Sequence, residues 1–217
     1  MLGLIEKDLR LTLARKQTLF IFLAVALVMR LSMDGPFLIG YLTMFATIVA
    51  VGTISFDEYD NGFAFLLTLP FDRKTYVREK YLFCLLMAAA AWCLGAVLYG
   101  VGNSLRHSAG SLRDELPMLL AMIPVMYLSA AVMIPLQLKF GSEKSRIALF
   151  ILFGLAAILL VGLRQGIGGS APGMAGLTET LESMSPLVIL FVLAAVCALT
   201  AYASYRWSVR IMEKKEY

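Results

Sequence analysis

The stretch GPFLIGYLTMFATIVAVGTISF, residues 35–56, contains no charged side chain, and DEYDNGFAFLLTLPFDRKTYVREKY, residues 57–81, follows it directly. A helix needs about 20 apolar residues to cross the roughly 30 Å hydrocarbon core of a membrane, and the first stretch is long enough. The second stretch opens with carboxylates and closes with basic residues. Together they indicate a membrane span that ends at a charged loop.

The composition of the whole chain supports a membrane protein. Of the 217 residues, 60% are hydrophobic and 16% are charged, whereas soluble domains have about 45–50% and about 25%. The apolar residues form long blocks, and the basic residues flank these blocks, so the net charge of +4 does not indicate nucleic-acid binding. The three cysteines lie inside the blocks without the close pairing of a metal or redox site.

We therefore predict an all-α integral membrane protein with six transmembrane helices in one transmembrane domain, residues 1–217. The first block, Thr18–Met29, has the length of a signal peptide, but no small-residue cleavage site follows it, so we interpret it as an uncleaved span. The Gly-rich segment 165–183 leaves open whether part of it dips back into the membrane. The six predicted spans lie near residues 17–33, 35–56, 76–105, 116–138, 146–164 and 184–207.

The positions of the basic residues predict the orientation. With six spans, 15 of the 19 lysines and arginines fall on the side of the N-terminus. Only Arg30, Arg106, Arg113 and Arg164 fall on the other side. Because cytoplasmic segments carry the excess of lysine and arginine, both termini are predicted to be cytoplasmic, in a plasma (inner) membrane.

The first 16 residues are too charged to cross a membrane. We predict an amphipathic interfacial helix over residues 1–16, lying on the inner membrane surface. A plain cytosolic extension is the alternative. The apolar residues at helical spacing are Leu2, Ile5, Leu9 and Leu13, opposite Glu6, Lys7, Arg10 and Lys16.

The loop 57–75 is longer than a simple chain reversal requires. After a turn at Asn61-Gly62 it presents an apolar stretch, residues 63–69, that ends at Pro70. An apolar stretch outside the hydrocarbon core must be covered by lipid or by a partner. Asp72 occupies a helix-capping position before a charged turn that continues into the third span.

The loop and the start of the third span, residues 57–81, resemble those of the permease subunits of type 2 ATP-binding cassette (ABC-2) transporters, especially the compact bacterial ones without a fused ATPase. The charged N-terminal helix and the six-span plan also agree with that family. The matching residues are Asp57-Glu58, Asn61-Gly62, Leu69-Pro70, Arg73, Val77 and Lys80-Tyr81.

The resemblance implies that a short coupling helix between spans two and three docks on a separate cytoplasmic ATPase. This chain has no G-x-x-x-x-G-K-[ST] loop, so ATP and magnesium would be bound by that partner and this chain would need no cofactor. A second permease copy, identical or related, is also implied. An interfacial helix lying in lipid is the alternative for the apolar stretch. The predicted ATPase-coupling residues are Asp57, Glu58, Asn61, Gly62, Phe63, Phe65, Leu66, Leu67, Leu69, Pro70, Arg73 and Lys80.

The cargo is not encoded in any motif. The resemblance implies export of a hydrophobic or amphipathic compound, such as a peptide or a drug-like molecule. Arg30 and Arg164 lie near the outer ends of spans one and five, where they either attract anionic parts of the cargo or simply extend to the headgroups.

Two other functions compete with this interpretation. A secondary transporter or channel working without ATP would carry ionisable residues deep in its spans, and the apolar blocks contain none apart from Arg30. An intramembrane serine protease would need a nucleophile and a base close in space. Ser104 and His107, the sole histidine, lie three positions apart on one segment, which is poor support for that geometry.

Overall fold

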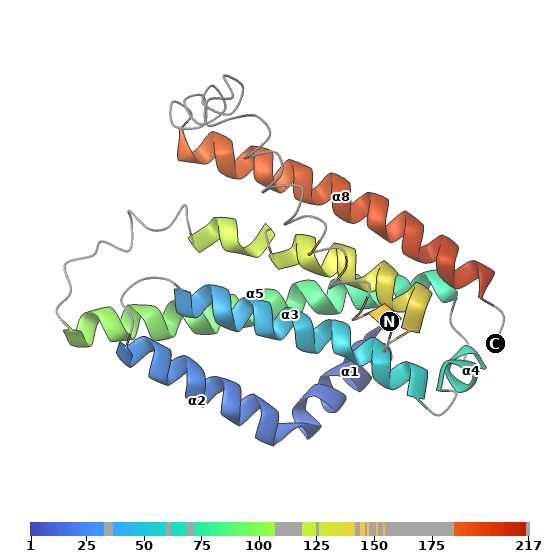
Figure 1. Cartoon of the computed structure of the whole chain (residues 1–217), viewed down its shortest axis with the longest axis horizontal. Helices are drawn as coiled ribbons and strands as arrows, with labels where there is room; N and C mark the ends of the chain where they lie inside the picture. Colours follow the sequence, from blue (N-terminus) through green and yellow to red (C-terminus); the bar gives the residue numbers. More distant parts are fainter. Residues whose placement is uncertain are drawn as a thin grey trace.

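The computed structural model describes residues 1–32, 37–59, 62–68, 72–106, 119–124, 126–141, 144, 145, 147, 151, 154 and 185–215. The regular structure of these residues is helical, as predicted (Figure 1). A helical stretch without a label runs over Leu119–Gly141. The labelled helices are α1 (Leu2–Ala14), α2 (Lys16–Ser32), α3 (Phe37–Glu58), α4 (Gly62–Leu67), α5 (Arg73–Arg106) and α8 (Pro186–Lys214).

Four of these helices are long and apolar enough to cross a membrane, namely α3, α5, the stretch Leu119–Gly141, and α8. Helix α2 has only 17 residues, but it follows α1 through a bend of 70°, and the bent pair counts as a fifth candidate. The predicted span 146–164 and the segment 165–183 fall outside the described residues, with isolated exceptions. The described part therefore holds four to five candidate spans, and the total of six stays a prediction.

Helices α3 and α5 lie side by side in the middle of the bundle and form the most extensive pair among the labelled helices (Figure 1). They approach closely at Gly95, where an added Cβ would lie 3.1 Å from the Cα of Ile39. Small residues let two helices in a membrane gain van der Waals contact along their backbones. The buried hydroxyls of Thr43 and Thr47 each donate to a carbonyl one turn earlier, at 2.7 and 2.9 Å. The centre of α3 thus buries these hydroxyls with hydrogen-bond partners.

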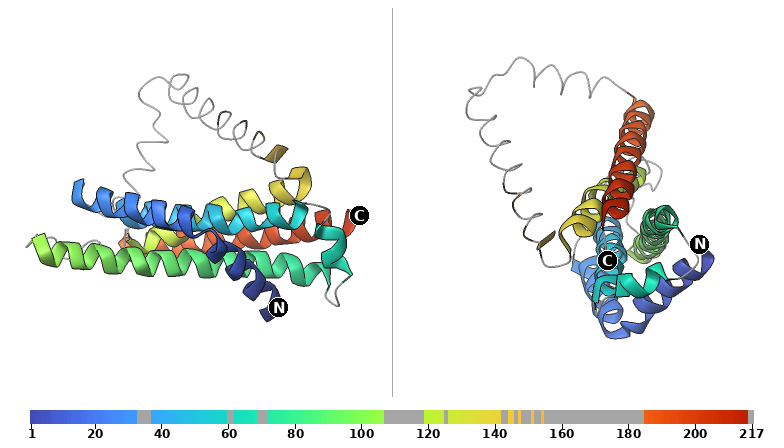
Figure 2. Two further views of the ribbon diagram at one scale, coloured as in Figure 1. Left: turned by 90° about the horizontal axis from the view of Figure 1, so that it is seen from below. Right: turned by 90° about the vertical axis from the view of Figure 1, so that its right-hand side faces the viewer.

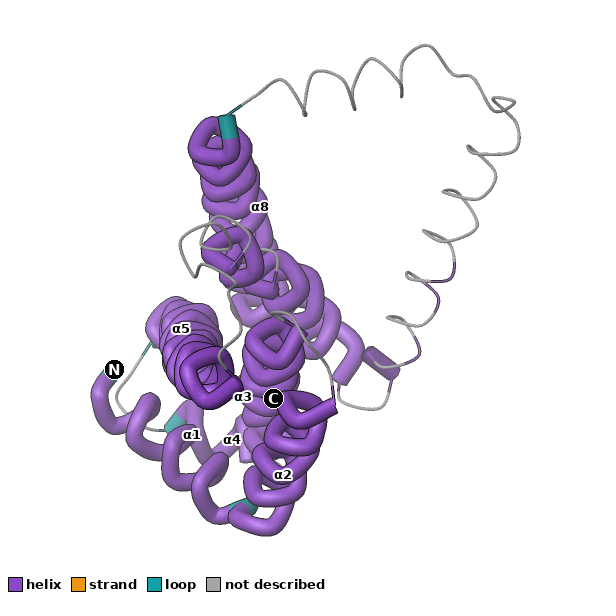
Figure 3. The backbone as a smooth tube through the Cα atoms, turned by 90° about the vertical axis from the view of Figure 1, so that its left-hand side faces the viewer, coloured by secondary structure: helices purple, strands orange, loops and turns teal. Residues whose placement is uncertain are grey.

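The other helices surround this pair, with α1 and α2 on one side and α8 on the other (Figure 3). The hydroxyl of Tyr81 on α5 hydrogen-bonds with Ser204 and Ser208 of α8, at 2.6 and 3.0 Å. The indole nitrogen of Trp92 donates to the carbonyl of Leu119, at 2.8 Å. Helix α5 is therefore connected by hydrogen bonds to both later helical stretches.

The start of α5 and the end of α8 meet at the end of the bundle that also carries α4 (Figure 2). Nη1 of Arg73 lies 3.0 Å from each of the carbonyl oxygens of Met212, Glu213 and Lys215. A cation is favourable there because the last carbonyls of a helix carry partial negative charge. An ion pair between Lys7 and Asp57 brings α1 to the same end. The end of α8 thus lies beside α4, α1 reaches the same end of the bundle through Lys7, and the side of the membrane that this end faces stays a prediction.

Candidate functional site

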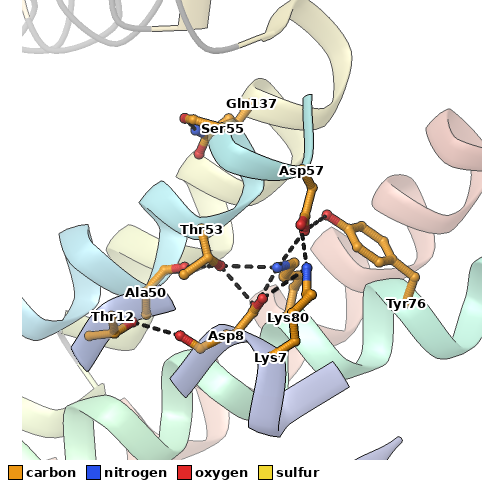
Figure 4. A network of polar contacts seen from close by, with 10 residues as sticks. All are labelled: Lys7, Asp8, Thr12, Ala50, Thr53, Ser55, Asp57, Tyr76, Lys80 and Gln137. Atoms are coloured by element: carbon orange, nitrogen blue, oxygen red, sulfur yellow. Dashed lines mark hydrogen bonds and ion pairs between the residues drawn. The ribbon is translucent and has the colours of Figure 1, made fainter. Parts of the chain in front are cut away.

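A cluster of charged and polar side chains is buried where α1, α3 and α5 meet (Figure 4). Three of its charged members are almost inaccessible to solvent, since the side chains of Lys80, Asp8 and Asp57 are 1%, 0% and 4% exposed, whereas that of Lys7 is 28% exposed. We call this set the charge cluster. Its members are Lys7 and Asp8 from α1, Thr53 and Asp57 from α3, and Tyr76 and Lys80 from α5.

The ammonium group of Lys80 occupies the middle of the charge cluster. Its Nζ lies 2.8 Å from Oδ2 of Asp57 and 3.0 Å from the hydroxyl oxygen of Thr53. It also pairs with Oδ2 of Asp8. A lysine ammonium has three donors, and these three acceptors use all of them.

The two carboxylates have further partners. Lys7 pairs with Asp57 and lies 3.0 Å from Oδ1 of Asp8. The hydroxyl of Tyr76 donates to Asp57 at 2.9 Å, and the hydroxyl of Thr53 lies 2.9 Å from Asp8. Two lysines and two aspartates cancel in formal charge, which limits the cost of burying them. Removing one of the buried charged members, such as Lys80 or Asp8, would leave an uncompensated buried charge, which costs about 3–5 kcal/mol.

Glu79 stands next to Lys80 in the sequence but outside this pairing. It is 0% exposed, and neither of its carboxylate oxygens has a hydrogen-bond partner among the described residues. Burying a carboxylate without a partner is costly. Glu79 is therefore a buried group whose charge the nearby pairs do not neutralise by direct contact.

Helix α4 begins directly beside the charge cluster. An added Cβ at Gly62 would lie 2.7 Å from the carbonyl oxygen of Asp57, so the chain can turn back this closely from α3 only with glycine. Phe63 is 3% exposed and its ring meets that of Tyr76 edge-on, with centroids 5.6 Å apart. Leu66 is also buried, whereas Phe65 is 70% exposed. Helix α4 thus has one face packed on the bundle and one open face.

The structure gathers the described members of the predicted coupling site at one end of the bundle. Asp57 and Lys80 lie in the charge cluster, and Arg73 holds the end of α8. Glu58 lies beside Gly141, since an added Cβ there would be 2.6 Å from its Oε1. The predicted members outside the described residues are Asn61, Leu69, Pro70 and the side chain of Leu67.

Of the two arginines predicted near the outer path, the structure describes only Arg30. Arg164 lies outside the described residues. Arg30 is 7% exposed, its Nη2 donates to Oδ1 of Asn103 at 2.5 Å, and its guanidinium stacks 5.0 Å from the ring centroid of Tyr99. These contacts attach the end of α2 to the end of α5. They favour a structural role for Arg30 over a free cation in a path.

The sequence pattern did not reveal the part that α1 plays. Leu2, Leu9 and Leu13 of the predicted apolar face are exposed, as a helix on a membrane surface requires. The buried residues are instead Leu4, Asp8 and Thr12, which recur every four positions along one face. This polar stripe packs against α3 and α5. Its spacing was the available signal for Asp8, whereas nothing local pointed to Lys7, Thr53 or Tyr76.

An intramembrane serine protease and a metal site both find little support among the described residues. The hydroxyl of Ser104 donates to the carbonyl of Gly100 at 3.0 Å, an ordinary contact within a helix, and His107 lies outside the described part. Within that part, no three His, Cys, Asp or Glu side chains gather as a metal ion would need.

The long apolar helices, the buried charges and the half-exposed α4 describe a helical bundle suited to a membrane, with one charged end. Residues 3–213 match the family model of the ABC-2 family transporter protein, and because this match covers nearly the whole chain, the chain belongs to that family. It is therefore a multi-pass membrane component of an ABC transporter, from a permease family whose ATPase is a separate subunit. The family predicted from the resemblance is thus confirmed for the chain as a whole. No curated protein and no solved structure matches the chain.

Proposed function

We propose that this chain is the permease subunit of an exporter and that a separate cytoplasmic ATPase docks on α4 and the adjoining loop, residues 57–75. The main support for this proposal is the exposed side chain of Phe65. Phe63 and Leu66 fix the opposite face of α4 to the bundle, so Phe65 is presented outward on a short, anchored helix. A large aromatic side chain held in this way suits the centre of a protein interface.

The contacts of α4 supply a route by which docking would move the spans. Phe63 packs on Tyr76, Tyr76 hydrogen-bonds to Asp57, and Asp57 pairs with Lys80. A push on α4 would therefore act on α3 and α5 together, and through Asp8 on α1 as well. Closure of an ATPase dimer would use such a rigid connection to change which side of the membrane the transport path opens to.

The orientation and the cargo are parts of the same proposal. The lysine and arginine excess supports a cytoplasmic position for the α4 end. Away from that end, the described spans carry charge only at Arg30 and Arg106. This apolar remainder suits a hydrophobic or amphipathic cargo, such as a peptide or a drug-like compound. Two permease copies, identical or related, would enclose the path, and two ATPase copies would drive it.

The docking proposal is tested at Phe65. The tagged chain is purified from its native membranes, subunits with a G-x-x-x-x-G-K-[ST] loop are identified by mass spectrometry, and ATP hydrolysis by the preparation is measured. We expect Phe65→Asp to lose the ATPase subunit, because a carboxylate would be desolvated at the interface, and Phe65→Leu to keep it. The proposal fails if Phe65→Asp, inserted at the normal level, retains the ATPase in the amount found with the unchanged chain.

A further inference from the structure

A cavity of about 290 Å³ lies between α2, α3 and α5, in the part of the bundle that is apolar enough for the membrane. All side chains lining it are apolar. Phe22 stacks against Phe45 at its wall, and Leu19, Val49, Ala90 and Leu94 complete the surface on the three helices. We call it the apolar groove, because it is open along part of its length.

The apolar groove offers water no polar side chain as a partner, and it is large enough for an apolar ligand. Dry apolar cavities of about 150 Å³ already bind small apolar molecules, and water needs several polar partners to occupy a site. In a membrane, the most abundant apolar molecule of elongated shape is a phospholipid acyl chain. The lining residues of α3 run from Leu42 to Val49 and those of α5 from Met87 to Leu94, so the groove follows each helix for roughly 10 Å.

Two cations stand in line with one end of the apolar groove. Arg15 lies one helical turn before Leu19, whose amide donates to its carbonyl at 3.2 Å, and Lys16 is the next residue. The guanidinium of Arg15 stacks 4.1 Å above the ring of Phe56, which lies seven positions after Val49 and hence on the same face of α3.

Neither cation has an anionic partner among the described residues. Arg15 and Lys16 are both exposed, and no ion pair or side-chain hydrogen bond joins either to a described residue. The contact of the guanidinium carbon with the Phe56 ring nevertheless restrains this exposed side chain. A guanidinium can form bidentate hydrogen bonds with a phosphate.

We propose that the apolar groove binds one acyl chain of an anionic phospholipid, whose phosphate is held by Arg15 and Lys16 at the bend between α1 and α2. The groove supplies the apolar contact and the two cations supply selectivity for negative charge. The lipid would fill the space inside the 70° bend between α1 and α2. Binding of this kind does not depend on the proposed docking of an ATPase.

The test measures which lipid the purified chain retains. Delipidated protein is exposed to phosphatidylglycerol or to phosphatidylcholine, and the bound lipid is counted by native mass spectrometry. We expect the unchanged chain to prefer phosphatidylglycerol. The variant Arg15→Gln/Lys16→Gln should lower phosphatidylglycerol retention roughly tenfold and leave phosphatidylcholine retention as it was. Ala90→Phe, which fills the apolar groove, should lower the retention of both lipids.

Matched controls separate the groove from the general membrane surface. Arg210→Gln/Lys214→Gln removes the same charge from exposed positions on α8, and Ala198→Phe adds the same bulk to an exposed position there. Both controls should retain lipid like the unchanged chain.

Three outcomes would overturn the proposal. The first is equal retention of the two lipids by the unchanged chain. The second is unaltered phosphatidylglycerol retention in Arg15→Gln/Lys16→Gln, a variant that leaves the core untouched. The third is a disulfide between two copies of Leu94→Cys in a chain without Cys84, Cys93 and Cys197, because it would show that a second chain, and not a lipid, covers the groove.

Discussion

Tyr76 and Asp57 are 19 positions apart in the sequence, yet the hydroxyl of Tyr76 lies 2.9 Å from the carboxylate of Asp57. Helix α4 lies between them in the chain. The hydrogen bond therefore connects the two segments on either side of α4, because it joins the last turn of α3 to the first turn of α5. Because Phe63 packs on the same tyrosine ring, the position of α4 depends on this closure.

Replacing Tyr76 with phenylalanine should lower the thermal stability of the purified chain. The ring and its contact with Phe63 remain, but the carboxylate loses a buried donor, a loss of about 1.5–3 kcal/mol for a hydrogen bond to a charged group. Thermal unfolding in detergent measures the change. Tyr202→Phe on α8, where the side chain is 61% exposed, is the control and should have little effect. Equal melting temperatures for Tyr76→Phe and the unchanged chain would contradict the role assigned to the hydroxyl.

Lys80 and Asp8 should behave as an energetically coupled pair. Lys80→Met alone leaves the buried carboxylates short of a cation, and Asp8→Asn alone leaves an excess of positive charge. We expect the double variant to lose less stability than the two single variants together, with a coupling of more than about 1 kcal/mol. A double-mutant cycle on unfolding free energies provides the measurement. Additive losses would show that the two groups do not stabilise each other.

Glu79→Gln should be tolerated or should raise the melting temperature. Glutamine has nearly the same shape, and it removes a buried carboxylate that has no hydrogen-bond partner among the described residues. The matched change at a paired carboxylate, Asp57→Asn, should instead destabilise the chain. If Glu79→Gln lowers the melting temperature as much as Asp57→Asn, Glu79 has a stabilising partner that the structure does not reveal.

Two glycine substitutions should act in opposite directions. Gly62→Ala places a methyl group 2.7 Å from a backbone oxygen of α3, so α4 must shift and the chain should lose more than about 1 kcal/mol. Gly52→Ala meets nothing within 4 Å inside α3 and should stabilise the helix by about 0.5–1 kcal/mol. Thermal unfolding and retention of the ATPase are measured for both variants. A Gly62→Ala chain with normal stability would contradict the tight turn.

The orientation can be read by labelling single cysteines with a membrane-impermeant thiol reagent. In a chain without Cys84, Cys93 and Cys197, we expect Thr68→Cys, next to α4, to react only from the cytoplasmic side. Ser104→Cys, exposed near the far end of α5, should react only from outside. Labelling of Thr68→Cys in intact cells would reverse the topology.

The sequence predicted the long helices well because their pattern is local. The uncharged block 35–56 coincides closely with α3 at Phe37–Glu58, since a membrane helix is marked by the polarity of consecutive residues. The apolar stretch 63–69 overlaps α4 at Gly62–Leu67 for a related reason, because the turn at Asn61-Gly62 precedes it. The sequence pattern did not reveal which apolar side chains of these helices face the inside of the bundle.

The charge cluster required information that no single helix contains. From the sequence alone, Asp8 looks like a surface residue in a charged N-terminal segment. Lys80 looks like one of several basic residues beside a span. Their pairing depends on how α1, α3 and α5 are rotated about their axes, which the packing of the whole bundle decides. The Leu4, Asp8 and Thr12 stripe indicated a buried face of α1, but the stronger leucine pattern suggested a different face.

Helix α5 runs for 34 residues without a proline, a rod of about 50 Å, considerably longer than the roughly 30 Å hydrocarbon core. Near one end Arg73 holds the last turn of α8, and near the other Asn103 accepts a hydrogen bond from Arg30 of α2. Because the two attachments are made by one continuous helix, a tilt of α5 at the Arg73 end would also displace α2 at the Asn103 end.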